Sequence, residues 1–391
     1  MIQLLNNFQF LRDQKISFGT KKNFDRVILL VIIVFGFLLR IYTAFFTSLT
    51  HFHIDSVGYF EQANTLLANG YTNYFPNGYP FIIALFKYVA GSNALSFLLW
   101  MNVILSTISI YFVYHISRSV FQNVAIAAIA AFILAVFPTQ INYVRWLMTE
   151  VLSAFLLLGG YFFYLRNRMF FSGLFFGVAT AVRTEIIPIL LLLIFAEFIR
   201  TRRIYISVLS GFLIPVLIVG SYCYLKTGYF SLAGHSRVNI LFSITSSGGY
   251  VDWLYQDKHP EITTTGQAIN LYVHTMLSEP WQYFKNRVAN LWELWGFFPS
   301  ASDGNRGLLF RMVIGLCNLF LLSFGFLGWW RNRKNYNAVI IIFPFVVVTF
   351  IHIVLLSLPR YTYTVEPFMI ILASWTVYNV MIWFKKIIVK N

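Results

Sequence analysis

Residues 27–46 read VILLVIIVFGFLLRIYTAFF, which is the first long apolar run of the chain. A run of about 20 apolar residues is long enough to cross the hydrocarbon core of a bilayer as one α-helix. Its end, Arg40 to Phe46, offers no convincing small-residue cleavage site, so we expect the run to stay in the protein rather than to be removed as a signal sequence. This stretch indicates a helical membrane protein.

The composition extends this prediction to the whole chain. Its 391 residues are 58% hydrophobic, 19% aromatic and only 11% charged, whereas soluble domains have about 25% charged residues. Long apolar runs alternate with short basic clusters, which predicts an all-α polytopic membrane protein. We expect one transmembrane domain, residues 27–384, between cytoplasmic tails at residues 1–26 and 385–391. About ten spans are predicted, near residues 27–46, 94–116, 124–141, 148–165, 170–183, 186–200, 204–225, 308–330, 337–357 and 364–384.

The basic residues predict the orientation of these spans. With both termini in the cytoplasm, 17 of the 29 Lys and Arg residues fall in short cytoplasmic loops and tails, which is the positive-inside pattern. The net charge of +15 then reflects orientation and attraction to anionic lipid headgroups, and nucleic acid is not an expected partner. The cytoplasmic cations are Arg12, Lys15, Lys21, Lys22, Arg26, Arg118, Arg166, Arg168, Arg200, Arg202, Arg203, Arg331, Arg333, Lys334, Lys385, Lys386 and Lys390.

The carboxylates follow the opposite distribution, because most of the 14 Asp and Glu residues lie in predicted external segments or at outer span ends. Polar function is therefore expected on the external face. Two external segments are long, about residues 47–93 and 226–306. We expect short interfacial helices in both rather than a separate folded domain, and Ser56 to Ala68 has the amphipathic pattern of one such helix.

The first external segment contains HFHIDSVGY at residues 51–59, in which Asp55 is the principal candidate. A carboxylate at this position could satisfy the free amides of a helix N-terminus. It could equally act as a general base at the membrane surface. His51, His53 and Asp55 could together bind a divalent metal, but alternate spacing on a loop is a weak signal. The chemistry considered below needs no metal, and no cofactor is expected.

Three further external turns carry charged residues. Arg145 and Glu150 flank a short turn, Arg183 and Glu185 follow the segment GLFFGVATAVR at residues 173–183, and Arg360 is flanked by tyrosines. Each set has a structural alternative, such as a helix start, a headgroup contact or an aromatic-belt anchor. The small residues of the 173–183 segment predict close helix packing.

Taken together, these side chains suit one task, which is to hold an anionic lipid phosphate while an acceptor hydroxyl is activated. Arginine forks match the geometry of a phosphate, and a carboxylate can activate an acceptor hydroxyl. A sugar that leaves a polyprenyl phosphate needs no general acid, because the departing phosphate is already a stable anion. A base for the acceptor and cations for the phosphate are sufficient.

The same residues carry a family resemblance. The Asp55 loop with Gly70…Tyr79-Pro80, the Arg145…Thr149-Glu150 turn, the Gly173…Gly177-Val-Ala…Arg183 segment and Arg360-Tyr361…Pro367 resemble motifs of the membrane glycosyltransferases of the C-type fold. The resemblance is to the bacterial branch related to protein O-mannosyltransferases and lipid A aminoarabinose transferase. It covers about residues 27–370.

The resemblance implies transfer of a sugar from a polyprenyl-phosphate donor to a lipid, glycan or protein acceptor, at the external face of a bacterial plasma membrane. It implies that Asp55 is the catalytic base and that Glu150 is a second functional acid, with Arg145, Arg183 and Arg360 as phosphate contacts. Two features depart from the pattern. Asp55 is followed by Ser56, whereas a second acid at this position would complete a paired-acid motif. The large C-terminal soluble domain of some relatives is not expected in this chain, so we expect the loops to select the acceptor.

Further substrate contacts are predicted in the external segments, at Glu61, His53, His235, Arg237 and Tyr361. His235 and Arg237 belong to a segment that is similar to the family's variable acceptor-side region, although a solvated loop is an equal alternative. Trp281, Trp292 and Trp295 could stack on sugars, but interfacial anchoring is the favoured interpretation.

Two other functions use the same class of ligand. A flippase or transporter of lipid-linked sugars needs ionisable groups near the middle of the bilayer and broken helices, whereas the charged residues of this chain lie mostly at span ends. A polysaccharide ligase or polymerase would use a lipid diphosphate donor and a larger external loop later in the chain. Both alternatives remain open at this point.

Overall fold

The computed structural model describes residues 18–47, 54–72, 74–203, 205–296 and 308–390. The described residues form helices, with one isolated β-bridge between Ser247 and Tyr250. The all-α prediction is therefore confirmed. The elements are α2 (Phe18–Phe45), α3 (Ile54–Leu67), α4 (Gly78–Ala90), η1 (Gly91–Asn93), α5 (Ala94–Phe121), α6 (Val124–Val136), α7 (Pro138–Asn142), η2 (Tyr143–Arg145), α8 (Thr149–Tyr164), α9 (Met169–Val182), η3 (Thr184–Ile186), α10 (Ile187–Thr201), α11 (Ile206–Thr227), α12 (Ser236–Thr245), α13 (Tyr255–Lys258), α14 (Thr265–Ser278), α15 (Pro280–Trp295), α16 (Leu308–Arg331), α17 (Tyr336–Ile341), α18 (Phe343–Val354), η5 (Pro359–Thr364) and α19 (Glu366–Lys390).

Six helical segments are long and apolar enough to cross a membrane, and a seventh span is possible if the bent pair formed by α6 and the α7–η2 segment counts as one. The chain is therefore an integral membrane protein, but the predicted total of about ten spans is not shown. Helices do occupy the other predicted positions. α8, α9 and α10 have 16, 14 and 15 residues, so at 1.5 Å per residue they are about 21–24 Å long, less than the hydrocarbon thickness of about 30 Å.

The first predicted external segment contains more helix than the sequence indicated. α3 matches the amphipathic helix predicted at Ser56 to Ala68, but α4 begins at Gly78 and joins α5 through η1. The sequence interpretation placed the start of this apolar stretch near residue 94, whereas the structure extends it back to Gly78. Pro80 lies in the first turn of α4, where proline is compatible with a helix.

Close packing of α9 against α11 depends on glycine, as predicted. A Cβ atom on Gly173 would lie 2.0 Å from the carbonyl oxygen of Val208, and one on Gly177 would lie 2.4 Å from that of Phe212. Neither distance is possible between real atoms, so the two backbones touch only because both side chains are missing. This contact fixes the C-terminal end of α9, where Arg183 follows.

A fully buried arginine joins α2, α5 and α6. α6 ends before Pro138, which leaves carbonyl groups of its last turn without helical donors. The Arg40 guanidinium donates to the carbonyl oxygens of Leu134 (3.2 Å) and Ala135 (3.1 Å), and its Nε donates to Ser106 Oγ (2.7 Å). Arg40 therefore replaces the missing donors at the bend between α6 and α7.

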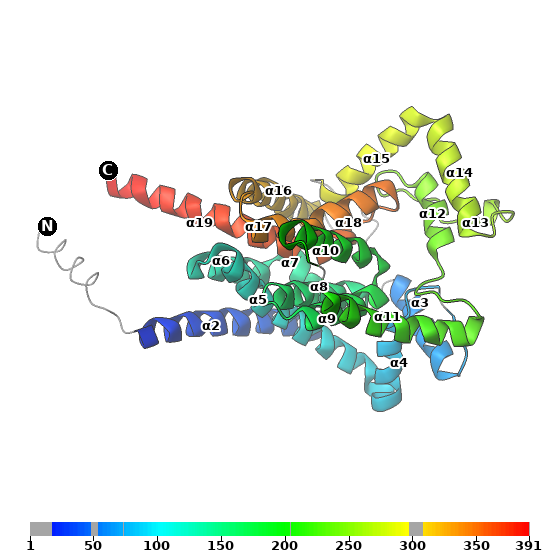
Figure 1. Cartoon of the computed structure of the whole chain (residues 1–391), viewed down its shortest axis with the longest axis horizontal. Helices are drawn as coiled ribbons and strands as arrows, with labels where there is room; N and C mark the ends of the chain where they lie inside the picture. The colour runs from blue at the N-terminus through cyan, green and yellow to red at the C-terminus, as the bar shows by residue number, and fades with distance from the viewer. Residues whose placement is uncertain (1–17, 48–53, 73, 204, 297–307, 391) are drawn as a thin grey trace, which may run out of the picture.

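The long helices share one general direction in Figure 1. The start of α2 and the end of α19 lie at one end of the molecule, while α3 and α12–α15 lie at the opposite end, which we call the site end. This arrangement agrees with two termini on the same side of a membrane. Which side faces the cytoplasm remains a prediction from the charge distribution.

Candidate active site

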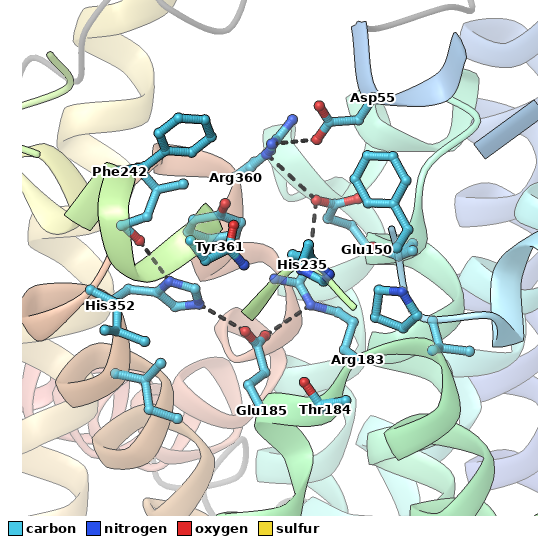
Figure 2. Close-up of a pocket in the computed structure, with 18 of the residues that line it drawn as sticks. Asp55, Glu150, Arg183, Thr184, Glu185, His235, Phe242, His352, Arg360 and Tyr361 are labelled. Carbon is cyan, nitrogen blue, oxygen red and sulfur yellow. Dashed lines mark hydrogen bonds and ion pairs between the residues drawn. The ribbon is translucent and has the colours of Figure 1, made fainter. Parts of the chain in front are cut away.

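A cavity of about 420 Å³ opens at the site end, where α3, α8, α12, α18, η3 and η5 meet. Its charged lining comes from helix ends that are far apart in sequence (Figure 2). Asp55 is the second residue of α3 and Glu150 the second residue of α8, while Arg183 follows the last turn of α9. The charged and ionisable side chains of the lining are Asp55, Tyr59, Tyr74, Glu150, Arg183, Glu185, His235, His352, Arg360 and Tyr361.

Arg360 lies between two carboxylates. Its Nη2 donates to Asp55 Oδ2 at 2.6 Å, and its Nε lies 3.9 Å from Glu150 Oε1. The side chains differ in access to solvent, since Asp55 is 25% exposed, Arg360 7% and Glu150 3%. An acceptor that enters from solvent would therefore meet Asp55 before Glu150.

Arg183 makes a second pair of ion pairs in the cavity. Its Nε donates to Glu185 Oε1 at 2.8 Å, and its Nη1 lies 3.4 Å from Glu150 Oε1. One oxygen of Glu150 thus faces both arginines, while its Oε2 has no hydrogen-bond partner among the described residues. Burial alone would raise the pKa of Glu185, but Arg183 and His352 outweigh burial and hold that pKa at about 2.

Tyr361 lies at the centre of these cations. Its ring stacks on His352 with 3.9 Å between the centroids, and the guanidinium carbons of Arg183 and Arg360 lie 5.2 and 5.5 Å from its centroid. Burial raises the pKa of the Tyr361 phenol, which keeps it neutral at physiological pH. Tyr361 was predicted as a substrate contact, and the structure brings it into the cavity.

Other aromatic side chains also line the cavity. They are Tyr59, Tyr74, Phe75, Phe242 and Trp253. The predicted site residue His235 lies among them, with its ring 5.8 Å from that of Tyr74 and 5.9 Å from that of Phe75. Burial lowers the pKa of His235, which favours its neutral form.

Three predicted substrate contacts do not line the cavity. Arg145 donates from Nε to Asn142 Oδ1 at 3.0 Å and lies over the Trp146 ring. Glu61 is exposed on α3, and Arg237 donates to the carbonyl oxygen of Ile262 at 2.6 Å. His53 lies outside the described residues. A role for these four residues stays a prediction.

The tryptophans of α15 also lie outside the cavity lining. Trp281 and Trp292 are 66% and 56% exposed on the outer face of the helix. Trp295 is buried and donates from its indole nitrogen to Thr349 Oγ1 at 3.0 Å. For Trp295 the contact is structural, and interfacial anchoring remains the prediction for the other two.

Glu185 and His352 line the cavity but were not among the predicted site residues. Glu185 was noted in the sequence only as a partner of Arg183, and His352 lies inside a run predicted to be an apolar span. Within the described part of the chain, no group of three or more His, Cys, Asp or Glu side chains is arranged to hold a metal ion. Both histidines of the predicted His51, His53 and Asp55 group lie outside the described residues.

Comparison with known proteins gives one family match and several structural matches. Residues 76–222, which include Glu150 and Arg183, match the family described as dolichyl-phosphate-mannose-protein mannosyltransferase. None of the curated proteins matches the chain in sequence.

Solved structures of an oligosaccharyltransferase from the archaeon Archaeoglobus fulgidus share the fold. The apo form has a TM-score of 0.59 and 14% identity, covering 92% of this chain and 51% of that chain. The form tethered to an acceptor peptide with the NVT sequon has a TM-score of 0.60 and 14% identity, covering 92% and 50%. The complex of this enzyme, AglB, with an inhibitory peptide and a dolichol-phosphate has a TM-score of 0.53 and 14% identity, covering 93% and 51%.

This chain therefore spans about half the length of the archaeal structures that it matches. At 14% identity these structures show the fold alone, and the family match adds the sequence relationship. The resemblance read from the motifs is confirmed: over residues 76–222 the chain is similar to the dolichyl-phosphate-mannose-protein mannosyltransferases, a family of membrane glycosyltransferases, and its fold is the C-type fold.

Proposed function

We propose that this protein transfers a sugar from a polyprenyl-phosphate donor to an acceptor hydroxyl at the external face of the membrane, with Asp55 as the general base. The observation that carries the proposal is the contact of Arg360 with Asp55 at 2.6 Å in a cavity that also holds Arg183. A carboxylate and two phosphate-matching cations thus lie side by side. The family match supports the donor class, because its members are described by their dolichyl-phosphate-mannose substrate.

The reaction is a single inverting displacement. The acceptor oxygen forms a bond to the anomeric carbon while the bond from that carbon to the phosphate oxygen breaks. Asp55 takes the proton of the acceptor hydroxyl, and the bonding electrons leave with the polyprenyl phosphate, which gains one negative charge. Cations that already surround the phosphate stabilise this charge as it develops.

Arg360 links the base to the leaving group in this mechanism. In the ligand-free cavity its Nη2 is bound to Asp55, so an arriving phosphate competes with the carboxylate for the same guanidinium. Protonation of Asp55 during transfer weakens its hold on Arg360. The guanidinium then pairs more strongly with the phosphate at the moment when the phosphate gains charge.

Glu150 and Arg183 have supporting roles. Glu150 Oε1 lies 3.4 Å from Arg183 and 3.9 Å from Arg360, so it holds the two guanidinium groups at a fixed separation. Glu185 holds Arg183 from the other side. Because Glu150 is only 3% exposed, we assign the proton transfer to Asp55 and the positioning of the cations to Glu150.

The test uses membranes that contain wild type, Asp55→Asn or the control Asp257→Asn, which makes the same change at an exposed carboxylate of α13. Radiolabelled polyprenyl-phosphate hexoses are supplied, and label is followed into water-soluble, lipid and polymer fractions. We expect Asp55→Asn to lower transfer by about 10²–10⁴-fold, with protein level and donor binding retained, and Asp257→Asn to leave transfer unchanged.

Three outcomes would contradict the proposal. Normal turnover by Asp55→Asn would remove Asp55 as the base. Label that crosses the bilayer while it stays on the donor would identify a flippase. Transfer that requires a lipid diphosphate donor would identify a ligase or polymerase.

A further inference from the structure

A buried arginine of α15 joins two helices that reach the cavity from different parts of the chain. The Arg287 side chain donates from Nη2 to the carbonyl oxygens of Ser243 (3.0 Å) and Ser246 (2.8 Å), at the end of α12. Its Nη1 donates to the carbonyl oxygens of Val354 and Leu355, at the end of α18. One guanidinium group therefore holds two helix C-termini together.

The chemistry of arginine suits this position. The last turn of an α-helix leaves carbonyl groups without helical donors, and these groups carry about half a negative charge in total. Two such helix ends face Arg287, which is only 7% exposed. A guanidinium group has five N–H donors in a planar fork, so it can satisfy both ends at once and place its positive charge between them.

Asn290, one turn further along α15, makes a second connection between the same two helix ends. It is fully buried. Its Nδ2 donates to the carbonyl oxygens of Ile353 and Leu355, both at 3.3 Å. Its Oδ1 accepts from the hydroxyl of Ser246 and the backbone N–H of Gly248, both at 3.2 Å. We call Arg287 and Asn290 together the α15 bridge.

Both helix ends continue into the lining of the cavity (Figure 2). On α12, Phe242 lines the cavity and immediately precedes Ser243. After α18, Leu356 belongs to the same buried cluster as Phe242, and Tyr361 packs against this cluster. The hydroxyl of Ser357 donates to the carbonyl oxygen of Asn290 at 2.9 Å, so the contacts of α15 extend to the segment that leads into η5.

We propose that Arg287 is a positioning residue for sugar transfer. Through the end of α18 it holds Arg360 in place for the donor phosphate, and through the end of α12 it holds Phe242 on the opposite side of the same cluster. Arg287 is not part of the cavity lining, so it acts through these residues and not on the substrate. The proposal rests on the proposed function for the identity of the ligand.

The α15 bridge also determines how the second external segment behaves. α12 and α15 both belong to this segment, and the bridge attaches them to the chain just before η5. The external helices therefore do not move as an independent acceptor-binding unit. Binding of an acceptor against α12 and binding of a phosphate at Arg360 depend on the same set of hydrogen bonds.

The first experiment is independent of catalysis. Hydrogen exchange is measured by mass spectrometry on the full chain in lipid nanodiscs, for wild type, Arg287→Gln and the control Lys285→Gln, which changes an exposed cation of the same helix. Because hydrogen bonds to a charged group are lost at both helix ends, we expect Arg287→Gln to exchange about tenfold faster in residues 243–248 and in residues 353–358. Exchange in α9 should stay as in wild type, and Lys285→Gln should match wild type throughout.

Faster exchange at only one of the two helix ends, or at neither, would overturn the proposal. If Arg287→Gln exchanges rapidly over the whole chain, the same comparison is made with Asn290→Ala, which removes the second connection and keeps the buried cation. Faster exchange at both ends in Asn290→Ala supports the α15 bridge, and unchanged exchange at either end overturns it.

The second experiment measures donor KM and kcat with a radiolabelled polyprenyl-phosphate hexose for wild type, Arg287→Gln, Asn290→Ala and Lys285→Gln. Because Arg360 loses its fixed position, we expect both bridge variants to raise the donor KM about tenfold and Lys285→Gln to leave it unchanged. A residue that only stabilises the fold would lower the amount of active protein, and hence the apparent kcat, without changing KM. An unchanged donor KM in both bridge variants would therefore exclude the positioning role.

The failure of the proposed function has a different signature. Wild type would then transfer no sugar from any polyprenyl-phosphate donor. The exchange of residues 243–248 and 353–358 would still show whether Arg287 joins the two helix ends.

Discussion

Arg360 joins distant parts of the chain, since it binds Asp55 across 305 positions. Its fork also reaches toward Glu150 and lies over the Tyr361 ring. We predict that Arg360→Lys raises the donor KM about tenfold, because an ammonium keeps the charge but cannot match phosphate and carboxylate with a planar fork. Steady-state kinetics with varied donor measures this effect.

The matched control is Arg333→Lys, which changes an exposed arginine between α16 and α17. The control should behave as wild type. A donor KM that is unchanged in Arg360→Lys would show that Arg360 contributes only a charge, or that it does not contact the donor.

The ion pair of Glu185 with Arg183 makes the stability of the protein depend on pH. The pKa of Glu185 falls from 4.5 to about 2 in the folded protein, so the unfolded chain binds its proton at a higher pH than the folded chain does. The stability from this carboxylate is therefore fully present above about pH 4.5 and is lost as pH falls toward 2. We expect Glu185→Gln to lower the free energy of unfolding by about 1.5–3 kcal/mol at neutral pH.

Thermal unfolding of detergent-solubilised wild type and Glu185→Gln, followed from neutral pH into acid, tests the sign. The difference between the two midpoints should be constant at neutral pH and should shrink below about pH 4.5. A difference that grows on acidification would contradict the assigned ion pair.

The sequence identified most of these residues, but only those that stand out locally. Asp55, Glu150, Arg183 and Arg360 are charged residues at turns between apolar runs, which is a pattern that can be recognised without a structure. His352 gave no such signal, because its neighbours are apolar and its partner Glu185 is 167 positions away. Only the tertiary fold brings these two side chains together.

At the scale of elements, the bend after α6 depends on a side chain from another helix. Arg40 satisfies carbonyl groups of Leu134 and Ala135 that Pro138 deprives of helical donors. We predict that Arg40→Met lowers the free energy of unfolding by about 2–4 kcal/mol, because buried acceptors lose their partners. Arg26→Met is the control, since Arg26 is exposed on the same helix. Thermal unfolding in detergent compares Arg40→Met with Arg26→Met. An equal loss of stability in both variants would contradict the role of Arg40 as a donor to the end of α6.

The position of most helices was predictable from the spacing of apolar runs, but their lengths were not. α8 and α9 are mostly buried and short, and a buried short helix has the same apolar composition as part of a span. The sequence predicts an external turn between the last two spans, and Pro359–Thr364 forms η5 there, which places Arg360 and Tyr361. Such local turns depend on tertiary contacts that composition does not reveal.

For the whole molecule, the helix arrangement in Figure 1 puts the start of α2 and the end of α19 opposite the site end. Together with the positive-inside pattern, this predicts that the cavity faces the exterior. In intact cells a membrane-impermeant maleimide should label Glu261→Cys, whose side chain is 63% exposed between α13 and α14. It should label Lys334→Cys, between α16 and α17, only after permeabilisation.

Wild type is the control for this measurement, because Cys223 is buried and Cys317 is partly buried. Labelling of Lys334→Cys in intact cells would reverse the predicted orientation. The cavity would then open toward the cytoplasm. The proposed sugar transfer would in that case need a polyprenyl-phosphate donor on the cytoplasmic side of the membrane.

The long separation between Asp55 and Arg360 has a consequence for biosynthesis. A ribosome adds roughly 5–20 residues per second, so the 305 positions between them take roughly 15–60 seconds to translate. During this interval α3 has been made but its arginine partner has not. A nascent chain that stops before η5 therefore holds a complete Asp55 segment and no assembled cavity, so the protein gains its activity only when its final helices have inserted.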